Sequence, residues 1–297
     1  DMIMTGKRHD FVIDYDVGFD DEGRIRGVDF EFASRCGMSA DLSGPVNDRA
    51  MFHCDNAYFL ENVRIVSHRC KTNTVSSTAF RGFGGPQGMF AIEYVIDDIA
   101  RKLGKDPLHV RRVNFYGQGE RNVTHYQQVV EDNIIDDLFE QLLASSDYEK
   151  RRTEIRRYNE ASKVLRRGLA ITPVKFGISF TSTLLNQAGA LVHVYRDGTV
   201  QLNHGGTEMG QGLYVKVAQI VADEFGIGID KIRTTAADTS KVPNASATAA
   251  SSGSDMNGKA AQKAAAKILK RLIVFGAGHF GVSEAQVEFR DNRVHVG

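Results

Sequence analysis

The sequence predicts a mixed α/β protein of the α+β class, built from two lobes. Strand-like and helix-like segments alternate through both halves of the 297 residues, short turn signals separate them, and one strongly charged stretch divides the chain. We place the first lobe at residues 1–146, a charged helical linker at 147–167 and the second lobe at 168–297.

The first lobe begins with a predicted β-hairpin and continues with helices. Apolar and polar residues alternate through residues 9–37 on both sides of the turn sequence DDEGR, which is typical of two antiparallel strands. A helix is expected from Pro86 to Gly104, because proline suits a first helical position and glycine terminates helices. The Asp-Pro pair at 106–107 indicates the N-cap of a shorter helix, and residues 133–146 predict another.

The predicted linker is rich in lysine and arginine and poor in residues that form a core. We interpret it as a solvated helix that joins the lobes, and a docking surface for a partner is the alternative interpretation.

The second lobe alternates strands with helices. Its predicted elements are a β-rich stretch over 168–182, a hairpin over 188–206 turned at Asp197-Gly198, a helix over 213–225, a strand over 231–237, a helix that ends near Phe275, and a hairpin over 285–297 turned at Asp291-Asn292. Two loops of small residues, HGGTEMGQG and DTSKVPNASATAASSGSDMNG, each lead into one of the helices.

Glycine-rich turns at helix N-termini favour anions, because backbone N–H groups come close to a ligand there and the helix end carries partial positive charge. HGGTEMGQG is one such turn, and STAFRGFGGPQGMF at residues 77–90 is another. Neither matches a nucleotide motif: the first lacks the Lys-Ser/Thr of a P-loop, and the second does not fit GxGxxG. A purely structural role is the alternative for both turns.

Composition excludes several classes of protein. Lys+Arg and Asp+Glu both total 37, and a nucleic-acid binder would normally show a basic excess. The apolar runs are too short for a membrane span, so we expect a cytoplasmic protein. The three cysteines form no CxxC pair, and no HxxxH occurs, so we expect no metal held directly by protein ligands.

Several single residues admit two interpretations each. Arg81 is either a surface arginine or an anion-facing one, partly desolvated by its phenylalanine neighbours. Phe83 and Phe180 are core residues by default, and Arg49 is an exposed helix residue by default. Gln211 lies between two glycines, which favours a polar contact with a ligand.

Glu208, in the same turn as Gln211, is either a ligand contact or a helix cap.

Taken together, five stretches resemble the molybdenum-binding subunit of the xanthine dehydrogenase family. They are DRAMFHCDNAY, CKTNTVSSTAFRGFGGPQGMFAIE, KFGISFTSTLLNQAGALVHVYRDGTV, NHGGTEMGQGLYVKVAQ and VPNASATAASSGSDMNG. The resemblance follows the same order over nearly all 297 residues and covers the middle of that subunit. It implies two lobes of the xanthine dehydrogenase and aldehyde oxidase type, with a molybdopterin cofactor between them.

The resemblance also implies which residues meet the cofactor. The second lobe would contact the pterin and the oxo ligand of the metal through Met209, Gly210 and Gln211. The run Thr248, Ala249, Ala250 and Ser251 would line the pterin and its phosphate, and Arg81 and Gly82 would bind the cofactor from the first lobe.

The implied substrate is a purine. Phe83 and Phe180 would clamp its flat ring, one stacked and one edge-on, with Thr181 beside it. Arg49 would contact a purine oxygen and stabilise negative charge on the ring during the reaction.

The implied reaction belongs to purine catabolism: hypoxanthine and xanthine are hydroxylated to urate with water as the oxygen source. Electrons would leave through 2Fe-2S clusters and FAD on other domains or subunits to NAD, in an enzyme expected to be a dimer. The family's general base is a glutamate in a Gly-Glu-Pro-Pro segment that nothing here matches, and its substrate-contacting glutamate would lie before Asp1. We therefore expect the 297-residue chain, which looks like a piece of a longer protein, to be inactive by itself.

Two alternatives stay open. An aldehyde oxidase or another molybdenum hydroxylase is the first, although Arg49 and the sequence RGFGGPQ favour a purine enzyme. A non-catalytic module whose glycine turns bind a phosphate is the second.

Overall fold

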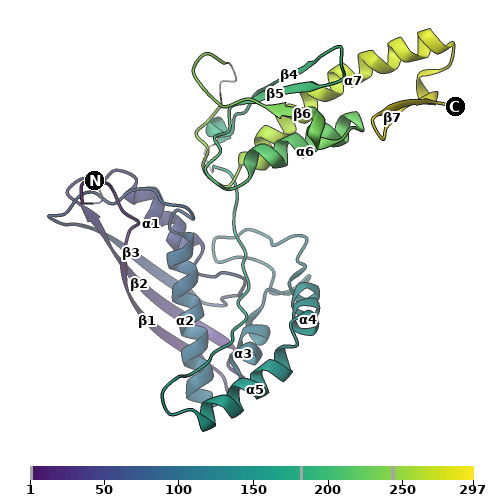
Figure 1. Ribbon diagram of the computed structural model, residues 1–297. Helices are drawn as coiled ribbons and strands as arrows, with labels where there is room; N and C mark the ends of the chain where they lie inside the picture. Colours follow the sequence, from purple (N-terminus) through teal and green to yellow (C-terminus); the bar gives the residue numbers. More distant parts are fainter. Residues whose placement is uncertain (1–2, 181–182, 242–244) are drawn as a thin grey trace. The chain divides into compact units, whose positions relative to one another are not determined.

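The chain forms two compact units, Asp1–Phe176 and Gly177–Gly297. The computed structural model describes residues 3–180, 183–241 and 245–297 (Figure 1). The lobe boundaries expected from the charged segment at 147–167 stay a prediction.

Unit 1 consists of a three-stranded sheet covered by helices. Its elements are β1 (Phe11–Phe19), β2 (Ile25–Gly37), α1 (Ser43–Phe52), β3 (Val63–Lys71), α2 (Gly85–Leu103), α3 (Pro107–Asn114), α4 (Ile135–Ser145) and α5 (Tyr148–Ala161). The strand order is β1-β2-β3, with β1 antiparallel and β3 parallel to β2. The predicted hairpin is therefore confirmed, whereas β3 was not predicted.

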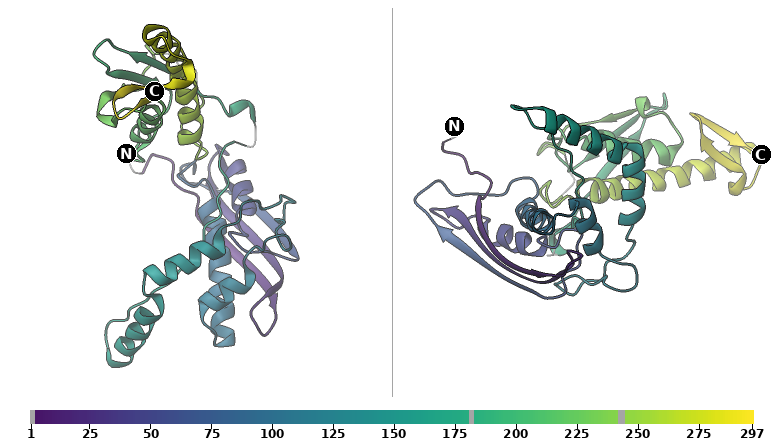
Figure 2. Two further views of the ribbon diagram at one scale, coloured as in Figure 1. Left: turned by 90° about the vertical axis from the view of Figure 1, so that its right-hand side faces the viewer. Right: turned by 90° about the horizontal axis from the view of Figure 1, so that it is seen from below.

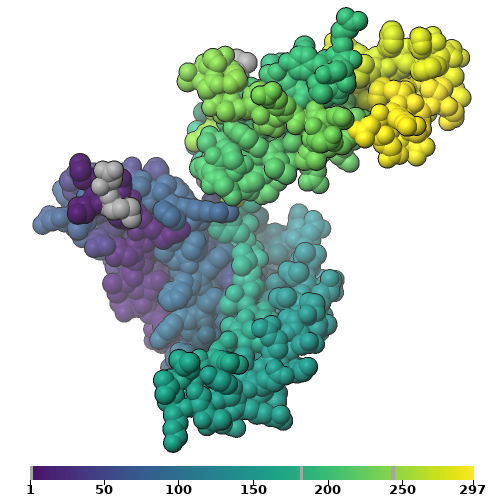
Figure 3. All heavy atoms as spheres, in the orientation of Figure 1, coloured from purple at the N-terminus to yellow at the C-terminus, as the bar shows by residue number. Residues whose placement is uncertain are grey.

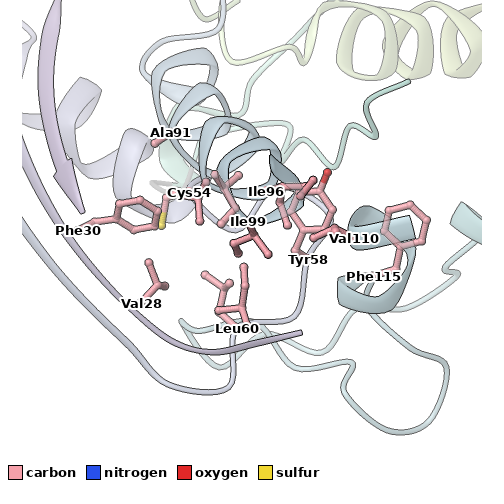
Figure 4. Packing of buried hydrophobic residues seen from close by; sticks show 14 of the residues in the cluster. Val28, Phe30, Cys54, Tyr58, Leu60, Ala91, Ile96, Ile99, Val110 and Phe115 are labelled. Atoms are coloured by element: carbon pink, nitrogen blue, oxygen red, sulfur yellow. The ribbon is translucent and has the colours of Figure 1, made fainter. Parts of the chain in front are cut away.

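The core of unit 1 lies between the sheet and α2. The sheet curves around α2 (Figures 1 and 2), and side chains from β2, such as Phe30, point toward Ile96 and Ile99 of the helix (Figure 4). Ile92, Ile96 and Ile99 fall on one face of α2 at helical spacing and are completely buried. Gly104 ends the helix with a left-handed φ of +65°, as its sequence position predicted.

The charged segment does contain a helix, α5, and this helix contacts unit 1. Tyr148 at its start is buried in the core, and Arg152 donates to the Asp106 carboxylate over 2.6 Å. Asp106 also caps α3, as predicted, by accepting a hydrogen bond from the Leu108 amide over 2.8 Å.

The segment that follows α5 lies on the surface of unit 1 (Figures 1 and 3). A β-rich stretch was predicted at 168–182, and this prediction is wrong for residues 168–180, which are all described and form no strand. Pro173 has no N–H to donate to a neighbouring strand, and its carbonyl instead accepts from the Asn56 side chain over 2.9 Å.

Unit 2 contains a second three-stranded sheet and two long helices. Its elements are η1 (Thr183–Leu185), β4 (Ala190–Val194), β5 (Val200–His204), α6 (Leu213–Phe225), η2 (Ile229–Lys231), β6 (Ile232–Thr234), the π-helical turn η3 (Gly253–Asn257), α7 (Gly258–Phe280), η4 (Glu284–Gln286), β7 (Val287–Arg290) and β8 (Arg293–Val296). The strand order is β4-β5-β6, and β7 and β8 form a separate hairpin.

Apolar residues of α6, including Val217 and Val221, are buried with Leu202 of β5 and Ala261 of α7. Both predicted hairpins and the 213–225 helix are confirmed, whereas α7 continues beyond Phe275 to Phe280. The mixed helix and strand architecture agrees with the predicted fold class. Among the described residues, no helix combines the length and the apolar character that crossing a membrane requires.

Candidate functional site

The glycine-rich turn before α2 is shaped by close packing against α1. A Cβ atom at Gly84 would lie 2.0 Å from the Val46 carbonyl oxygen, and one at Gly88 would lie 2.1 Å from that of Ala50. Gly84 also has a left-handed φ of +95°. These two glycines let the backbones of α1 and α2 touch, so packing explains them without any ligand.

The arginine that faces an aromatic ring of this turn is Arg8, from the start of the chain, and not Arg81. Its guanidinium carbon lies 4.3 Å from the centroid of the Phe80 ring, and its Nη2 donates to the carbonyl of Arg81 over 2.6 Å. The side chain of Arg81 is exposed rather than desolvated. Phe83 is half-buried and has a φ of +53°, which is strained for an aromatic residue.

Arg49 lies near the end of α1 and is half-buried. The interpretation of Arg49 as an exposed helix residue is therefore wrong. Its guanidinium carbon is 4.7 Å from the centroid of the Phe176 ring, and burial lowers the pKa of this guanidinium. The Phe176 ring also lies 4.9 Å from that of His53, whose Nδ1 donates to the Arg49 carbonyl over 3.0 Å. Burial, followed by the charge of Arg49, lowers the pKa of His53 to about 4.

Phe176 is a neighbour of Arg49 that sequence reasoning missed. A Cβ atom at Gly85 would lie 2.6 Å from Cε2 of this ring, so the glycine leaves the space that the ring needs. Phe176 stands in a segment that resembled a strand, and its partner Arg49 is distant in sequence, so no local signal could have paired them.

In unit 2, Glu208 acts as the cap of α6. Its carboxylate accepts hydrogen bonds from the amides of Gly210, Gly212 and Tyr214 at 2.8, 3.0 and 3.1 Å. These bonds, first the one from Tyr214, lower the pKa of Glu208. The capping interpretation of this residue is therefore confirmed, and the protein's own carboxylate takes the amides that an external anion would need at this helix end.

Gln211 folds back on the same turn. Its Nε2 donates to the Thr207 carbonyl over 2.8 Å, and its Oε1 accepts from the Met209 amide over 2.5 Å. Met209 and Gly210, at the tip of the turn, are exposed. Because a side-chain amide nitrogen carries two N–H groups, Gln211 retains one donor for another group.

The loop before η3 offers backbone amides instead. Within the described part of the chain, the amides of Ala249, Ala250 and Ser251 donate no hydrogen bond. Ala250 and Ser251 both have a φ of +55°, which is unusual for residues other than glycine. Ala249 and Ser251 are exposed and Ala250 is half-buried, so this part of the loop lies at the surface.

Hydrogen bonds join the predicted residues of unit 2 into one patch. The Thr207 amide donates to Oγ1 of Thr248 over 2.8 Å, which ties the turn at 205–212 to the loop before η3. The Ser179 amide donates to the Ala250 carbonyl over 2.7 Å, which brings the neighbouring Phe180 to the same loop. Thr181 lies outside the described residues.

The predicted residues of unit 1 come from two neighbouring elements. Arg49 lies on α1, and the turn with Arg81, Gly82 and Phe83 leads into α2, which packs against α1. Within the described residues, no three His, Cys, Asp or Glu side chains form a group that could hold a metal ion. Each unit thus carries one set of the predicted contacts, and their roles stay predictions.

Models of the molybdopterin cofactor-binding domain match the chain twice, over residues 1–115 and over residues 141–297.

Curated relatives include the xanthine dehydrogenase of Drosophila pseudoobscura pseudoobscura, 49% identical over 272 residues. The xanthine dehydrogenase/oxidase of Gallus gallus is 48% identical over the same length, and xanthine dehydrogenase 1 of Arabidopsis thaliana is 48% identical over 279 residues. The match to the Drosophila relative covers 92% of this chain and 20% of that protein. The chain thus spans about a fifth of the length of these relatives.

Solved structures share the fold. Quinoline 2-oxidoreductase from Pseudomonas putida aligns with a TM-score of 0.80 at 21% identity, over 98% of this chain and 38% of that one. The aldehyde oxidoreductase from Desulfovibrio desulfuricans aligns with a TM-score of 0.74 at 22% identity, over 98% of this chain and 33% of that one. By the two matches to its domain models, the chain belongs to the family of molybdopterin cofactor-binding domains, and xanthine dehydrogenases are among its relatives.

Proposed function

We propose that this chain is part of the molybdenum-binding region of an enzyme that hydroxylates purines, hypoxanthine and xanthine to urate. The observation that carries the proposal is the half-buried guanidinium of Arg49, supported on one side by the ring of Phe176 at 4.7 Å. A fixed cation in a partly dry place suits an oxygen that gains negative charge. The relatives named xanthine dehydrogenase support the same substrate class.

The described residues fit a molybdopterin. The unused amides of Ala249, Ala250 and Ser251 suit its phosphate, whereas the amides at the start of α6 are already taken by Glu208. Gln211, with Met209 and Gly210, would meet the pterin from the exposed turn, and Thr248 would hold that turn to the loop. When bound, the cofactor supplies the metal centre for the oxidation.

The cofactor contacts in unit 1 would come from Arg81, whose exposed side chain is accessible to an anionic ligand, and from the backbone at Gly82.

The substrate would meet Phe83 and Phe180, both half-buried, together with Thr181. Aromatic rings suit a planar heterocycle because they favour stacked or edge-on contacts. The role of Arg49 is to bind a ring oxygen of the purine and to stabilise negative charge there. The electron acceptors, 2Fe-2S clusters and FAD, would belong to other domains or subunits of a dimeric, cytoplasmic enzyme.

Replacing Arg49 in the complete holoenzyme tests this proposal. We expect Arg49→Met to lower kcat/KM for xanthine by roughly 100- to 1,000-fold and to leave aldehyde oxidation nearly unchanged, because an aldehyde offers no ring oxygen. Arg64→Met is the matched control, since Arg64 pairs with Asp29 on the exposed face of the sheet. Equal losses on xanthine and aldehyde would contradict the purine assignment, and a holoenzyme without molybdenum would contradict the enzyme assignment.

A further inference from the structure

We propose that Asp55 and Lys175 are positioning residues for Arg49. In this inference, their buried ion pair fixes the segment 173–176, hereafter the strap, so that Phe176 presents its ring to the guanidinium. The inference rests on the proposed role of Arg49 in binding a purine oxygen.

The strap is held by side chains rather than by a sheet. Nδ2 of Asn56 donates to the Pro173 carbonyl over 2.9 Å, and Oδ1 of Asn56 accepts from the Lys175 amide over 3.2 Å. Asn56 is only 1% exposed and donates also to Glu93 over 2.8 Å. Its carboxamide therefore has a fixed orientation and sets the position of the strap backbone beside the turn that follows α1.

The ion pair beside Asn56 is fully buried at Asp55, whereas the Lys175 side chain is 24% exposed. Oδ2 of Asp55 lies 3.0 Å from Nζ of Lys175 and accepts from the hydroxyl of Tyr116 over 2.6 Å, and the Asp55 side chain has no exposed surface. The Lys175 ammonium also donates to the hydroxyl of Tyr126 over 3.2 Å and lies 5.5 to 5.6 Å from the ring centroids of Tyr126 and Tyr116. Two aromatic rings and a carboxylate thus surround this ammonium.

Buried ion pairs contribute little net stability compared with apolar residues of the same size, and their best-attested use is to select one arrangement over its neighbours. Here the selected arrangement is the register of the strap. A slip by one residue would bring Val174 or Phe176 to the place of Lys175, and neither can pair with the Asp55 carboxylate.

The register of the strap decides what lies beside Arg49. Phe176 follows Lys175 directly, and its ring contacts both the Arg49 guanidinium and the His53 ring. Arg49, His53, Asp55 and Asn56 all belong to the end of α1 and the turn after it, so one short piece of chain carries both the guanidinium and the anchors of its support. A guanidinium with one face held on a ring loses less freedom when it binds an oxygen, because part of its ordering has already occurred.

The test uses the complete holoenzyme with three variants: Lys175→Met, Phe176→Leu and the combination of Lys175→Met with Arg49→Met. We expect each single variant to lower kcat for xanthine by roughly 10- to 100-fold, with aldehyde oxidation and molybdenum content close to those of the unchanged enzyme. Lys175→Arg should restore part of the loss. Lys102→Met is the matched control, because the exposed Lys102 side chain pairs with Asp98 on α2.

The combined variant separates positioning from a general structural defect. If Lys175 acts through Arg49, adding Lys175→Met to Arg49→Met lowers kcat for xanthine no further, whereas independent effects would multiply. Should Lys175→Met fail to load molybdenum, Phe176→Leu decides in its place, since it leaves the ion pair intact.

The inference is overturned if kcat is unchanged in both single variants, or if the variants lose xanthine and aldehyde oxidation equally. The proposed function still stands in that case, provided that Arg49→Met lowers xanthine turnover. If Arg49→Met itself leaves xanthine turnover unchanged, the proposed function fails, and the inference fails with it.

Discussion

The ring of Phe176, the last residue of unit 1, lies beside the guanidinium of Arg49 on α1, with 4.7 Å between the guanidinium carbon and the ring centroid. The contact joins α1 to the C-terminal end of unit 1 at the position where a substrate oxygen is proposed to bind. The stability of this region therefore depends on how closely α1, α2 and the strap pack.

Gly88→Ala is expected to destabilise unit 1. Its added Cβ would lie 2.1 Å from the Ala50 carbonyl oxygen, so α1 and α2 must move apart. The expected cost is about 3 kcal/mol in the free energy of unfolding, measured by urea denaturation followed by circular dichroism. Gly18→Ala is the control, because no atom lies within 4 Å of its added Cβ. Equal midpoints for the two variants would contradict the packing role of Gly88.

His53 is expected to make stability depend on pH. Its pKa is about 4 in the folded protein and 6.5 ordinarily, so between these values the unfolded chain binds a proton that the folded chain does not. The free energy of unfolding should therefore decrease as the pH falls through this range, by up to about 3 kcal/mol. His53→Gln should remove this part of the decrease, measured as the difference between the two proteins in urea denaturation at each pH. A difference in the free energy of unfolding that stays constant with pH would contradict the role of His53.

Glu208→Ala is expected to destabilise α6. The variant leaves three amides without their acceptor, so the melting temperature of unit 2 should fall, and Glu208→Gln should restore part of the loss. Because the pKa of Glu208 is lowered from 4.5, its stabilisation is fully present above that pH and is lost as the carboxylate becomes protonated at lower pH. Asp223→Asn, at an exposed position of the same helix, serves as the control in thermal denaturation.

The purified 297-residue chain is expected not to oxidise xanthine. No Gly-Glu-Pro-Pro segment occurs in it, and loss of a general base costs on the order of 100- to 10,000-fold in rate. Xanthine turnover and the molybdenum content per chain are the measurements. Detectable turnover or stoichiometric molybdenum in this chain would contradict the expectation.

The parts of the fold that follow from local signals were predictable. The hairpin turn at Asp291-Asn292 needs two left-handed residues, and both have a φ of that kind, +53° and +60°. The isoleucines of α2 show the helical period, and Gly104 ends this helix as expected. In each case the residues that determine the structure are close together in the sequence.

The parts that depend on distant residues were not predictable. Gly84 could be read as an anion-binding glycine because its contact with Val46 of α1 is visible only in the folded chain. The strap has the composition of a strand, yet its hydrogen bonds go to Asn56. Physical reasoning alone left the role of Arg49 open, since Phe176, which supports it, comes from the far end of the unit.

Asn56 gives the strap a different kind of attachment from the strands of the sheet. Two hydrogen bonds to one carboxamide hold the backbone of Pro173 and Lys175, so the strap can detach without any strand leaving the sheet. We therefore expect the Lys175 amide to exchange its hydrogen sooner than the amides between β1 and β2. In such an opening, the cationic group of Arg49 would lose its aromatic neighbour while the hydrophobic interior of the unit stayed intact.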